Sequence, residues 1–233
     1  MSNTSQAAII TGAGGHLGTA VAAAFRRHGI RLVLIDRQVD ALRASYADAA
    51  DVAVVATDLC EPEQVAEAVR SGAERFGRIN AVCHLAGAFR MGQPVHETSP
   101  DVFDFLMDVN ARTFVNLARA TVPHLLEHGG GSVITVGAGA ATKGAAQMGA
   151  YCASKSALMR LTEAMSAELK DRNINVNCVL PSIIDTPDNR AAMPDEVFSR
   201  WVSPAALADV IIFLCSDGAR SVHGASIPVT GLI

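Results

Sequence analysis

The sequence lacks any run of lysine and arginine of the kind that follows a phosphate backbone, and its formal net charge is only -4. We therefore expect no nucleic-acid partner. The sequence also lacks a Cys-x-x-Cys pair, and its cysteines are scattered and odd in number, which argues against a disulfide framework or a zinc site. We expect no bound metal, and this cysteine usage fits a reducing cytoplasm. The five cysteines are Cys60, Cys83, Cys152, Cys178 and Cys215.

Long hydrophobic runs are absent as well. Asp209 interrupts the apolar stretch "PAALADVIIFLC", and the first residues, "MSNTSQ", contain no basic segment followed by an apolar one. We therefore expect neither export nor a membrane anchor, and we expect a cytoplasmic location.

The sequence does contain enough apolar material for one sizeable core. It has 233 residues, of which 50% are hydrophobic, and it shows no internal repeat, low-complexity tract or linker. These features predict a single domain over residues 1–233.

Seven short β-branched runs alternate with longer segments whose apolar residues recur three and four positions apart. The runs are "AAIIT", "RLVLID", "DVAVVA", "NAVCHLA", "SVITVG", "INVNCVL" and "ASIPVT". Segments such as "HLGTAVAAAFRRHG", "PEQVAEAVRSGAERFG" and "SKSALMRLTEAMSAELKDR" are typical of the intervening helices. Such alternation gives right-handed crossovers. The predicted fold class is α/β: a doubly wound, Rossmann-type domain with a seven-stranded parallel sheet and helices on both faces.

The glycine-rich turn "TGAGGHLG", Thr11 to Gly18, directly follows the first predicted strand and opens a helix. Backbone N–H groups and the helix dipole can receive a pyrophosphate there, and glycines let it approach. Asp36 ends the second strand, where a carboxylate can accept hydrogen bonds from an adenosine ribose and would repel a 2′-phosphate. Asp36 thus favours NAD(H), whereas Arg37 could bind a 2′-phosphate and keeps NADP(H) as the alternative.

Tyr151 and Lys155 are four residues apart near the start of a predicted amphipathic helix, so both side chains project to the same side. A phenol with a pKa of about 10 is a poor acid or base at neutral pH, but a nearby ammonium stabilises the phenolate. We therefore expect Lys155 to lower the pKa of Tyr151. Such a tyrosine can exchange a proton with an oxygen while a nicotinamide exchanges hydride with the adjacent carbon.

In order along the chain, "TGAGGHLG", the strand-end aspartate, "TDL", "HLAG", "VN", "YCASK" and "LPSIIDTP" resemble the signatures of the short-chain dehydrogenases/reductases. The resemblance covers essentially the whole chain. It implies Tyr151, Lys155 and Asn110 as catalytic residues, with Asn110 holding a water that links Lys155 to solvent. It places Asp58 and Leu59 by the adenine, Ala86 and Gly87 along the cofactor, and Ile184 and Thr186 at the nicotinamide amide. The full implied cofactor-binding set is Gly12, Gly15, His16, Leu17, Gly18, Asp36, Arg37, Asp58, Leu59, Ala86, Gly87, Tyr151, Lys155, Pro181, Ile184 and Thr186.

Two positions depart from the family pattern. His16 stands where the family usually has a second glycine in the phosphate loop, and Ala138 stands where it has the catalytic serine. Loss of a donor aimed at a developing oxyanion costs on the order of 10² to 10³ in rate, so ordinary carbonyl reduction would need another donor. Thr135, Thr142 and Gln147 are the candidate replacements.

The chain is similar to the dihydropteridine reductase-like subgroup, which lacks that serine, above all in "DTPDNRAAMPDEVFSRW", Asp185 to Trp201. That similarity implies hydride delivery to a quinonoid dihydropterin. One alternative is reduction of a 3-oxoacyl thioester or a small ketone. The other is a catalytically weak NAD(H)-binding sensor or scaffold.

Two further expectations concern the surface. Prolines at positions 187, 194 and 204 bracket a short segment that we expect to form a substrate lid around residues 187–204, with Trp201 closing over the pocket or anchoring the lid. The segments at residues 101–128 and 151–170 carry more apolar positions than one face against a sheet requires. Family members commonly pair these helices, so a homodimer or homotetramer acting on a small-molecule substrate is expected.

Overall fold

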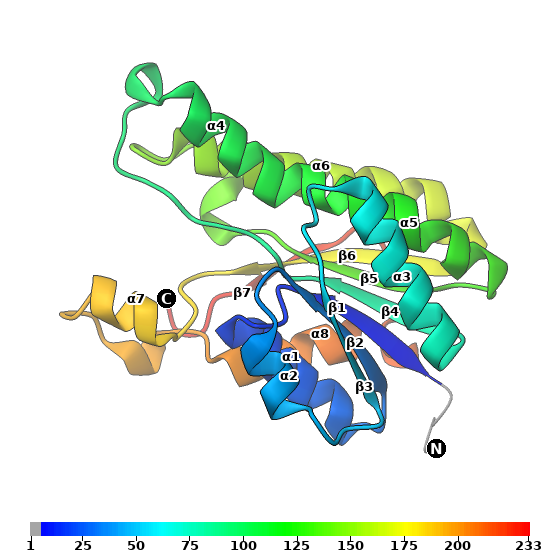
Figure 1. Ribbon diagram of the computed structural model, residues 1–233. Helices are drawn as coiled ribbons and strands as arrows, with labels where there is room; N and C mark the ends of the chain where they lie inside the picture. The colour runs from blue at the N-terminus through cyan, green and yellow to red at the C-terminus, as the bar shows by residue number, and fades with distance from the viewer. Residues whose placement is uncertain (1–5) are drawn as a thin grey trace.

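The computed structural model describes residues 6–233, and Figure 1 shows their arrangement. The expectation drawn from the first residues concerns 1–5, which lie outside this range. Seven strands form one parallel sheet in the order β3-β2-β1-β4-β5-β6-β7. The strands are β1 Ala7–Thr11, β2 Arg31–Asp36, β3 Val52–Ala56, β4 Ile79–His84, β5 Gly131–Val136, β6 Ile174–Pro181 and β7 Ser226–Val229. The predicted fold class is confirmed.

Helices cover both faces of this sheet. The α-helices are α1 His16–Arg27, α2 Asp40–Ser45, α3 Pro62–Phe76, α4 Pro100–Met107, α5 Thr113–Glu127, α6 Gly149–Leu169, α7 Pro187–Ala192 and α8 Pro204–Leu214. A π-helical turn, η2, spans Asp108–Arg112 between α4 and α5. The short 3-10 turns are η1 Val95–Glu97, η3 Gly139–Thr142, η4 Lys170–Arg172, η5 Phe198–Arg200 and η6 Asp217–Ala219.

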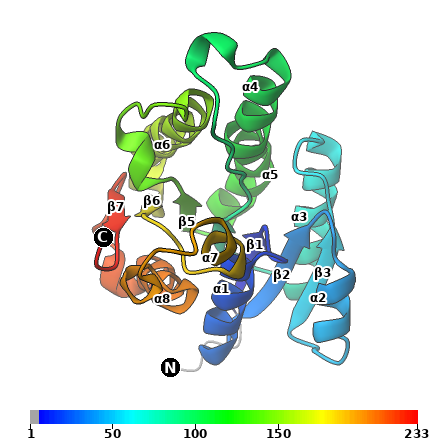
Figure 2. The same cartoon turned by 90° about the vertical axis from the view of Figure 1, so that its left-hand side faces the viewer.

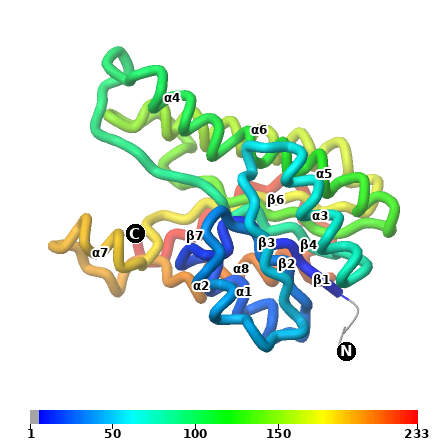
Figure 3. The backbone as a smooth tube through the Cα atoms, in the orientation of Figure 1, coloured from blue at the N-terminus to red at the C-terminus, as the bar shows by residue number. Residues whose placement is uncertain are grey.

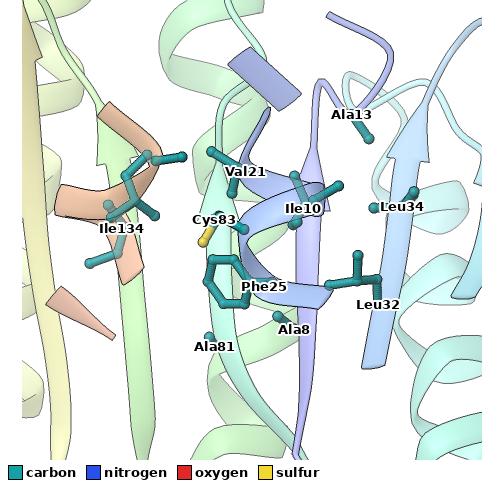
Figure 4. Close-up of a cluster of buried hydrophobic side chains, with 14 of the residues drawn as sticks. Ala8, Ile10, Ala13, Val21, Phe25, Leu32, Leu34, Ala81, Cys83 and Ile134 are labelled. Carbon is teal, nitrogen blue, oxygen red and sulfur yellow. The ribbon is translucent and has the colours of Figure 1, made fainter. Parts of the chain in front are cut away.

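Alternation along the strands decides which helix packs on which face. Ala8 and Ile10 of β1 belong to a buried cluster with α1 and α8, whereas Ala7 and Ile9 belong to a second cluster with α3, α5 and α6. Side chains of a strand point alternately to its two sides, so a strand covered on both faces is apolar at every position. Figure 4 shows the first cluster, with Phe25 of α1 lying over the central strands.

The strand predicted over "NAVCHLA" ends two residues earlier than expected. β4 stops at His84, which is paired with Thr11, the last residue of β1. The chain of β1 turns away at Gly12, so Leu85 and Ala86 have no partner on the β1 side, and the pairing of β4 with β5 ends at His84 and Thr135. They form the first residues of the segment that runs to α4.

The carboxyl ends of the strands meet at one edge, which faces the viewer in Figure 2. α7 lies in front of this edge, and the long segment between β4 and α4 leaves the sheet on the same side (Figure 3). Ligands of open parallel sheets bind outside the carboxyl ends of the strands. This edge is therefore where the predicted site residues are to be sought.

Phe25→Ala should lower the free energy of unfolding by about 3 to 5 kcal/mol, because it removes a fully buried ring between α1 and the sheet. Phe213→Ala on α8 is the matched control, since that ring is 52% exposed and its loss should cost less than about 1 kcal/mol. Urea denaturation measures both values, and equal losses would contradict this description of the core.

Candidate active site

The ends of β1, β2, β3 and β4 open onto a cavity of about 580 Å³. Thirteen of the predicted cofactor-binding residues line it: Gly12, Gly15, His16, Leu17, Gly18, Asp36, Arg37, Asp58, Leu59, Ala86, Gly87, Ile184 and Thr186. These residues come from five separate stretches of the chain. The other predicted members, Tyr151, Lys155 and Pro181, and the predicted catalytic Asn110, lie outside its lining.

The glycine turn sits tightly between β4 and α1. Gly12 has a φ of +65°, and a Cβ there would lie 2.8 Å from the backbone nitrogen of Ala86. A Cβ on Gly18 would lie 2.7 Å from the Cα of Ala13. Neither position has room for a side chain, so the two glycines hold the start of α1 directly against the strand ends.

The start of α1 can receive an anion. α1 lies wholly within the described residues, and it has neither a side-chain cap at Gly15 nor an acidic residue in its first turn. The unpaired N–H groups of a helix's first turn and its dipole together favour a negative group. His16 begins the helix and lines the cavity, with its Nε2 3.9 Å from the Asp188 carboxylate of α7.

Asp36 and Arg37 share the far end of this cavity. The Gly14 N–H donates to Asp36 Oδ2 at 2.9 Å, and the Arg37 N–H donates to Oδ1 at 2.7 Å. The carboxylate is thereby held at the mouth of the phosphate turn. Both residues line the cavity, so a negative and a positive side chain lie beside the same space. The geometry alone therefore does not choose between NAD(H) and NADP(H).

Several lining residues were not predicted. Thr57 is the most informative, because its buried Oγ1 has no hydrogen-bond partner among the residues that the structure describes. Thr57 is the first residue of the "TDL" motif and directly follows β3, so the family resemblance already pointed to this stretch of the chain. Phe105 and Val109 reach the cavity from α4 and η2, which the sequence pattern placed less accurately than the strands.

Gly87 joins the cavity to the predicted catalytic residues. A Cβ on Gly87 would lie 2.8 Å from Asn110 Oδ1 and 2.9 Å from Lys155 Nζ. Asn110 accepts from the Ala88 N–H at 2.9 Å and donates to the Ala88 carbonyl and to Ser154 Oγ, both at 3.0 Å. The structure thus brings Asn110, Lys155 and the edge of the cavity together around one glycine.

Lys155 and Tyr151 both lie in α6, but the expected tuning of the tyrosine is wrong for this structure. Lys155 donates to the Val136 carbonyl at 2.8 Å, and burial lowers the pKa of its ammonium to about 8. Burial raises the pKa of the Tyr151 phenol to about 12, with a smaller contribution from Cys152. Their spacing in α6 places both side chains on one side of the helix, as predicted. Desolvation, however, decides the direction in which the pKa of each group moves.

Two of the three candidate replacements for the family's serine, Thr135 and Thr142, are already engaged. Ala138 is buried just before η3. Thr135 lies in β5, where its Oγ1 is 2.9 Å from Thr162 Oγ1, and Thr142 donates to the Gly139 carbonyl at 2.9 Å. The side chain of Gln147 lines a second cavity, described below. As placed here, neither threonine hydroxyl has a free proton to offer a substrate.

The predicted lid segment contains α7 and η5. A single parallel bridge joins Ile184 to Val202, and Asp185 forms an ion pair with Arg190. Trp201 is 6% exposed, and its ring packs against Phe198 with centroids 4.9 Å apart. Of the two roles considered for Trp201, its burial fits the anchor.

His84 and Cys83 are core residues, as expected from their place in a strand. His84 lies between the hydroxyls of Thr11 and Thr113, at 3.0 and 3.3 Å, and burial lowers the pKa of its imidazole to about 3. Its ring is neutral at physiological pH and serves to connect β1, β4 and α5.

The described part of the chain shows neither of two other kinds of site. Residues 6–233 contain no cluster of three or more histidine, cysteine or acidic side chains that could hold a metal ion. No helix in the same range is long and apolar enough to cross a membrane.

A family model described as enoyl-(acyl carrier protein) reductase matches residues 12–231. The chain belongs to the short-chain dehydrogenase/reductase family. As a member of this family it is an NAD(P)-dependent oxidoreductase.

Individual family members are similar over nearly the whole length. The D-threitol dehydrogenase of Mycolicibacterium smegmatis is 28% identical, and the alignment covers 96% of this chain and 91% of the relative. The 3-ketoacyl-(acyl-carrier-protein) reductase of Brucella melitensis, solved with NADH, is 27% identical with a TM-score of 0.87 and 98% coverage of both chains. Carveol dehydrogenase of Mycobacterium avium, solved with NAD, is 27% identical with a TM-score of 0.86 and coverage of 97% and 96%.

The lowered pKa of Lys155 predicts a pH dependence of stability in the cofactor-free enzyme. Between about pH 8 and 10.5 the folded chain has lost this proton while the unfolded chain still holds it, so unfolding takes up a proton. The contribution of Lys155 to the free energy of unfolding should therefore rise with pH across this window.

Urea denaturation of the wild type and of Lys155→Met at several pH values between 7.5 and 10.5 measures this contribution as the difference between the two proteins. A difference that stays constant with pH would contradict the lowered pKa.

Proposed function

We propose that this enzyme transfers hydride between a nicotinamide dinucleotide and a carbon of a small organic substrate, with Tyr151 exchanging the proton. The observation that carries the proposal is the contact of Gly87, in the lining of the strand-end cavity, with Asn110 and Lys155. Tyr151 lies in the first turn of the same helix that holds Lys155. The buried amine thus lies at the edge of the cavity, and the phenol lies one helical turn before it in the same helix.

The residues present fit a dinucleotide. Gly12 and Gly18 would let the pyrophosphate approach the first turn of α1, where the chain offers N–H donors and no acidic side chain. The orphaned hydroxyl of Thr57, with Asp58 and Leu59 beside it, would face the adenosine half. Ile184 and Thr186 would border the nicotinamide half, as the family resemblance implies.

The bound nicotinamide supplies the hydride, and the chain supplies the proton. Because burial raises the pKa of Tyr151 to about 12, its phenol is protonated throughout the neutral range. A protonated phenol can act as a general acid toward the atom that gains charge as the neighbouring carbon is reduced. In this protonation state Tyr151 is able to donate the proton that reduction of the substrate requires. Lys155, buried nearby with a pKa of about 8, can return a proton to it.

Two substrate classes are proposed for testing. A quinonoid dihydropterin is supported by Ala138 and by the engaged hydroxyls of Thr135 and Thr142, because its reduction does not require a serine-type donor. A 3-oxoacyl thioester or small ketone is supported by the similarity to a 3-ketoacyl reductase over 98% of both chains. For this second class, a water or another donor would have to serve the carbonyl oxygen.

We further propose a cytoplasmic homodimer or homotetramer with a preference for NAD(H). The five free cysteines support the reducing compartment. Phe103 of α4 and Val115 of α5 are 44% and 46% exposed, which supports a partner subunit on these helices. Asp36 at the end of β2 supports NAD(H), and its neighbour Arg37 is the reason that NADP(H) remains the alternative.

Tyr151→Phe should reduce turnover by about 10² to 10⁴, because it removes the proton donor and leaves the cofactor cavity unchanged. The assay follows oxidation of NADH with quinonoid dihydropterin and, separately, with a 3-oxoacyl thioester. Tyr46→Phe is the matched control, because Tyr46 is the only other tyrosine and lies outside the site.

The pattern of turnover separates the candidates. Reduction of the dihydropterin alone would support the serine-independent chemistry, and reduction of the thioester would support the carbonyl chemistry. Tight binding of NADH without turnover of either substrate would contradict the proposal and favour the binding-only alternative.

Asp36→Asn should raise kcat/KM with NADPH relative to NADH by about tenfold or more, because it removes the negative charge that would face a 2′-phosphate. Steady-state kinetics with both cofactors measures the ratio. Asp40→Asn removes the same charge from exposed α2 and should leave the ratio unchanged. An unchanged ratio in Asp36→Asn would assign cofactor choice to other residues.

A further inference from the structure

A second cavity, of about 380 Å³, lies beside the candidate active site. One wall is the segment Arg90 to Gln93, which follows β4, and the facing wall is Gln147 to Ala150. Val102 and Leu106 of α4 also line it. The segment after β4 is the one that leaves the sheet on the side of the strand ends (Figure 3).

Each wall leads along the chain to Tyr151 or to a residue that contacts it. Ala150 precedes Tyr151 in the chain, and Phe89, which precedes Arg90, packs edge-on against the Tyr151 ring with centroids 4.8 Å apart. The two walls are tied together, because the Gly92 N–H donates to the Gln147 carbonyl at 2.9 Å. A molecule that reaches the phenol from this side therefore has the second cavity next to it.

The backbone at this junction is strained. Gln147 has a φ of +60°, a left-handed conformation that glycine adopts readily and glutamine does not. Such conformations are unfavourable and persist where the surroundings enforce them, often at binding sites. The backbone is not helical at Gln147, so Gln147 and Met148 form part of the cavity wall and α6 begins only at Gly149.

The lining of this cavity is mostly apolar or neutral, with one charged side chain. Arg90 is the only ionisable group among its lining residues, and no carboxylate lies there to neutralise it. The guanidinium lies over the ring of Phe105, 3.9 Å from the centroid. Stacking on one face orients a guanidinium and leaves its N–H edges free, and those edges match a carboxylate in a two-point interaction. Met91 and Met148 supply adaptable apolar surface for the atoms in between.

We propose that the second cavity binds the part of the substrate beyond the reacting carbon, and that this part is a short apolar chain ending in a carboxylate held by Arg90. The inference rests on the carbonyl branch of the proposed function, and the substrate class is an oxo acid. Its carbonyl carbon takes the hydride of the reduced nicotinamide, its oxygen takes the proton of Tyr151, and the C=O double bond becomes a C–H and an O–H bond. The products are a hydroxy acid and the oxidised nicotinamide, and solvent returns the proton to Tyr151.

The probes are 4-oxopentanoate, 5-oxohexanoate and 6-oxoheptanoate, each paired with its methyl ester, which keeps the ketone and removes the charge. Two quantities are measured on the full-length protein: kcat and KM with NADH, and the affinity of each compound for the NAD+-loaded enzyme by titration calorimetry. The variants are Arg90→Gln, Arg90→Lys, and Arg43→Gln on exposed α2 as the charge-matched control.

In the wild type, at least one acid should bind and react about tenfold better than its ester. In Arg90→Gln this preference should fall to about one through a higher KM for the acid, with the values for the ester unchanged. Arg90→Lys should retain part of the preference, and Arg43→Gln all of it. Circular dichroism and NADH affinity equal to those of the wild type show that Arg90→Gln is folded.

Equal binding of acids and esters in the wild type, or a preference that persists in Arg90→Gln, would overturn the inference while leaving the proposed function intact. If none of the compounds is reduced but the acid binds in an Arg90-dependent way, the carboxylate site at Arg90 is supported, and the oxo-acid substrate class is overturned together with the carbonyl branch on which it rests.

Discussion

The contact between the turn after β1 and the end of β4 is the constraint on which the site depends. Gly12 brings its Cα so close to Ala86 that a methyl group would touch the backbone nitrogen. That contact fixes the first turn of α1 over the strand ends, and it fixes where the chain after β4 begins its course toward Gly87 and Arg90. The position of the strand-end cavity and the start of the chain segment that leads to the Tyr151 region both depend on this one close approach of two backbones, which only glycine permits.

The sheet was predictable from sequence because each strand carries its own evidence. "RLVLID" and "INVNCVL" are short, β-branched and bounded by helix-patterned segments, and both form strands close to the expected bounds. That the residues following β1, β2, β3 and β4 gather around one cavity was predictable for the same reason, since parallel strands place their carboxyl ends at one edge. The exception was the last two residues of "NAVCHLA", whose state depends on where the neighbouring strand stops, and that is not a local property.

The electrostatics of the site and the second cavity were not predictable in this way. The i, i+4 spacing of Tyr151 and Lys155 fixes their common side, but it does not say that both are buried or that Lys155 donates to Val136. The walls of the second cavity come from segments more than fifty positions apart in the chain and are joined by a single backbone hydrogen bond. The sequence gives no sign of that contact between the two walls. The role of Arg90 can be inferred only from the fold, which places the ring of Phe105 beneath its guanidinium.

The bridge between Ile184 and Val202 closes the segment between them into a loop at its base. Its two ends lie side by side, so β6 and α8 keep their places whatever the chain does in between. Closing a longer loop at such a base costs little, because the entropy of closure grows only slowly with length. Changes of length or composition before Trp201 would therefore reshape the mouth of the site with little effect on the core, whereas Trp201, which is buried, anchors the segment and has to be kept.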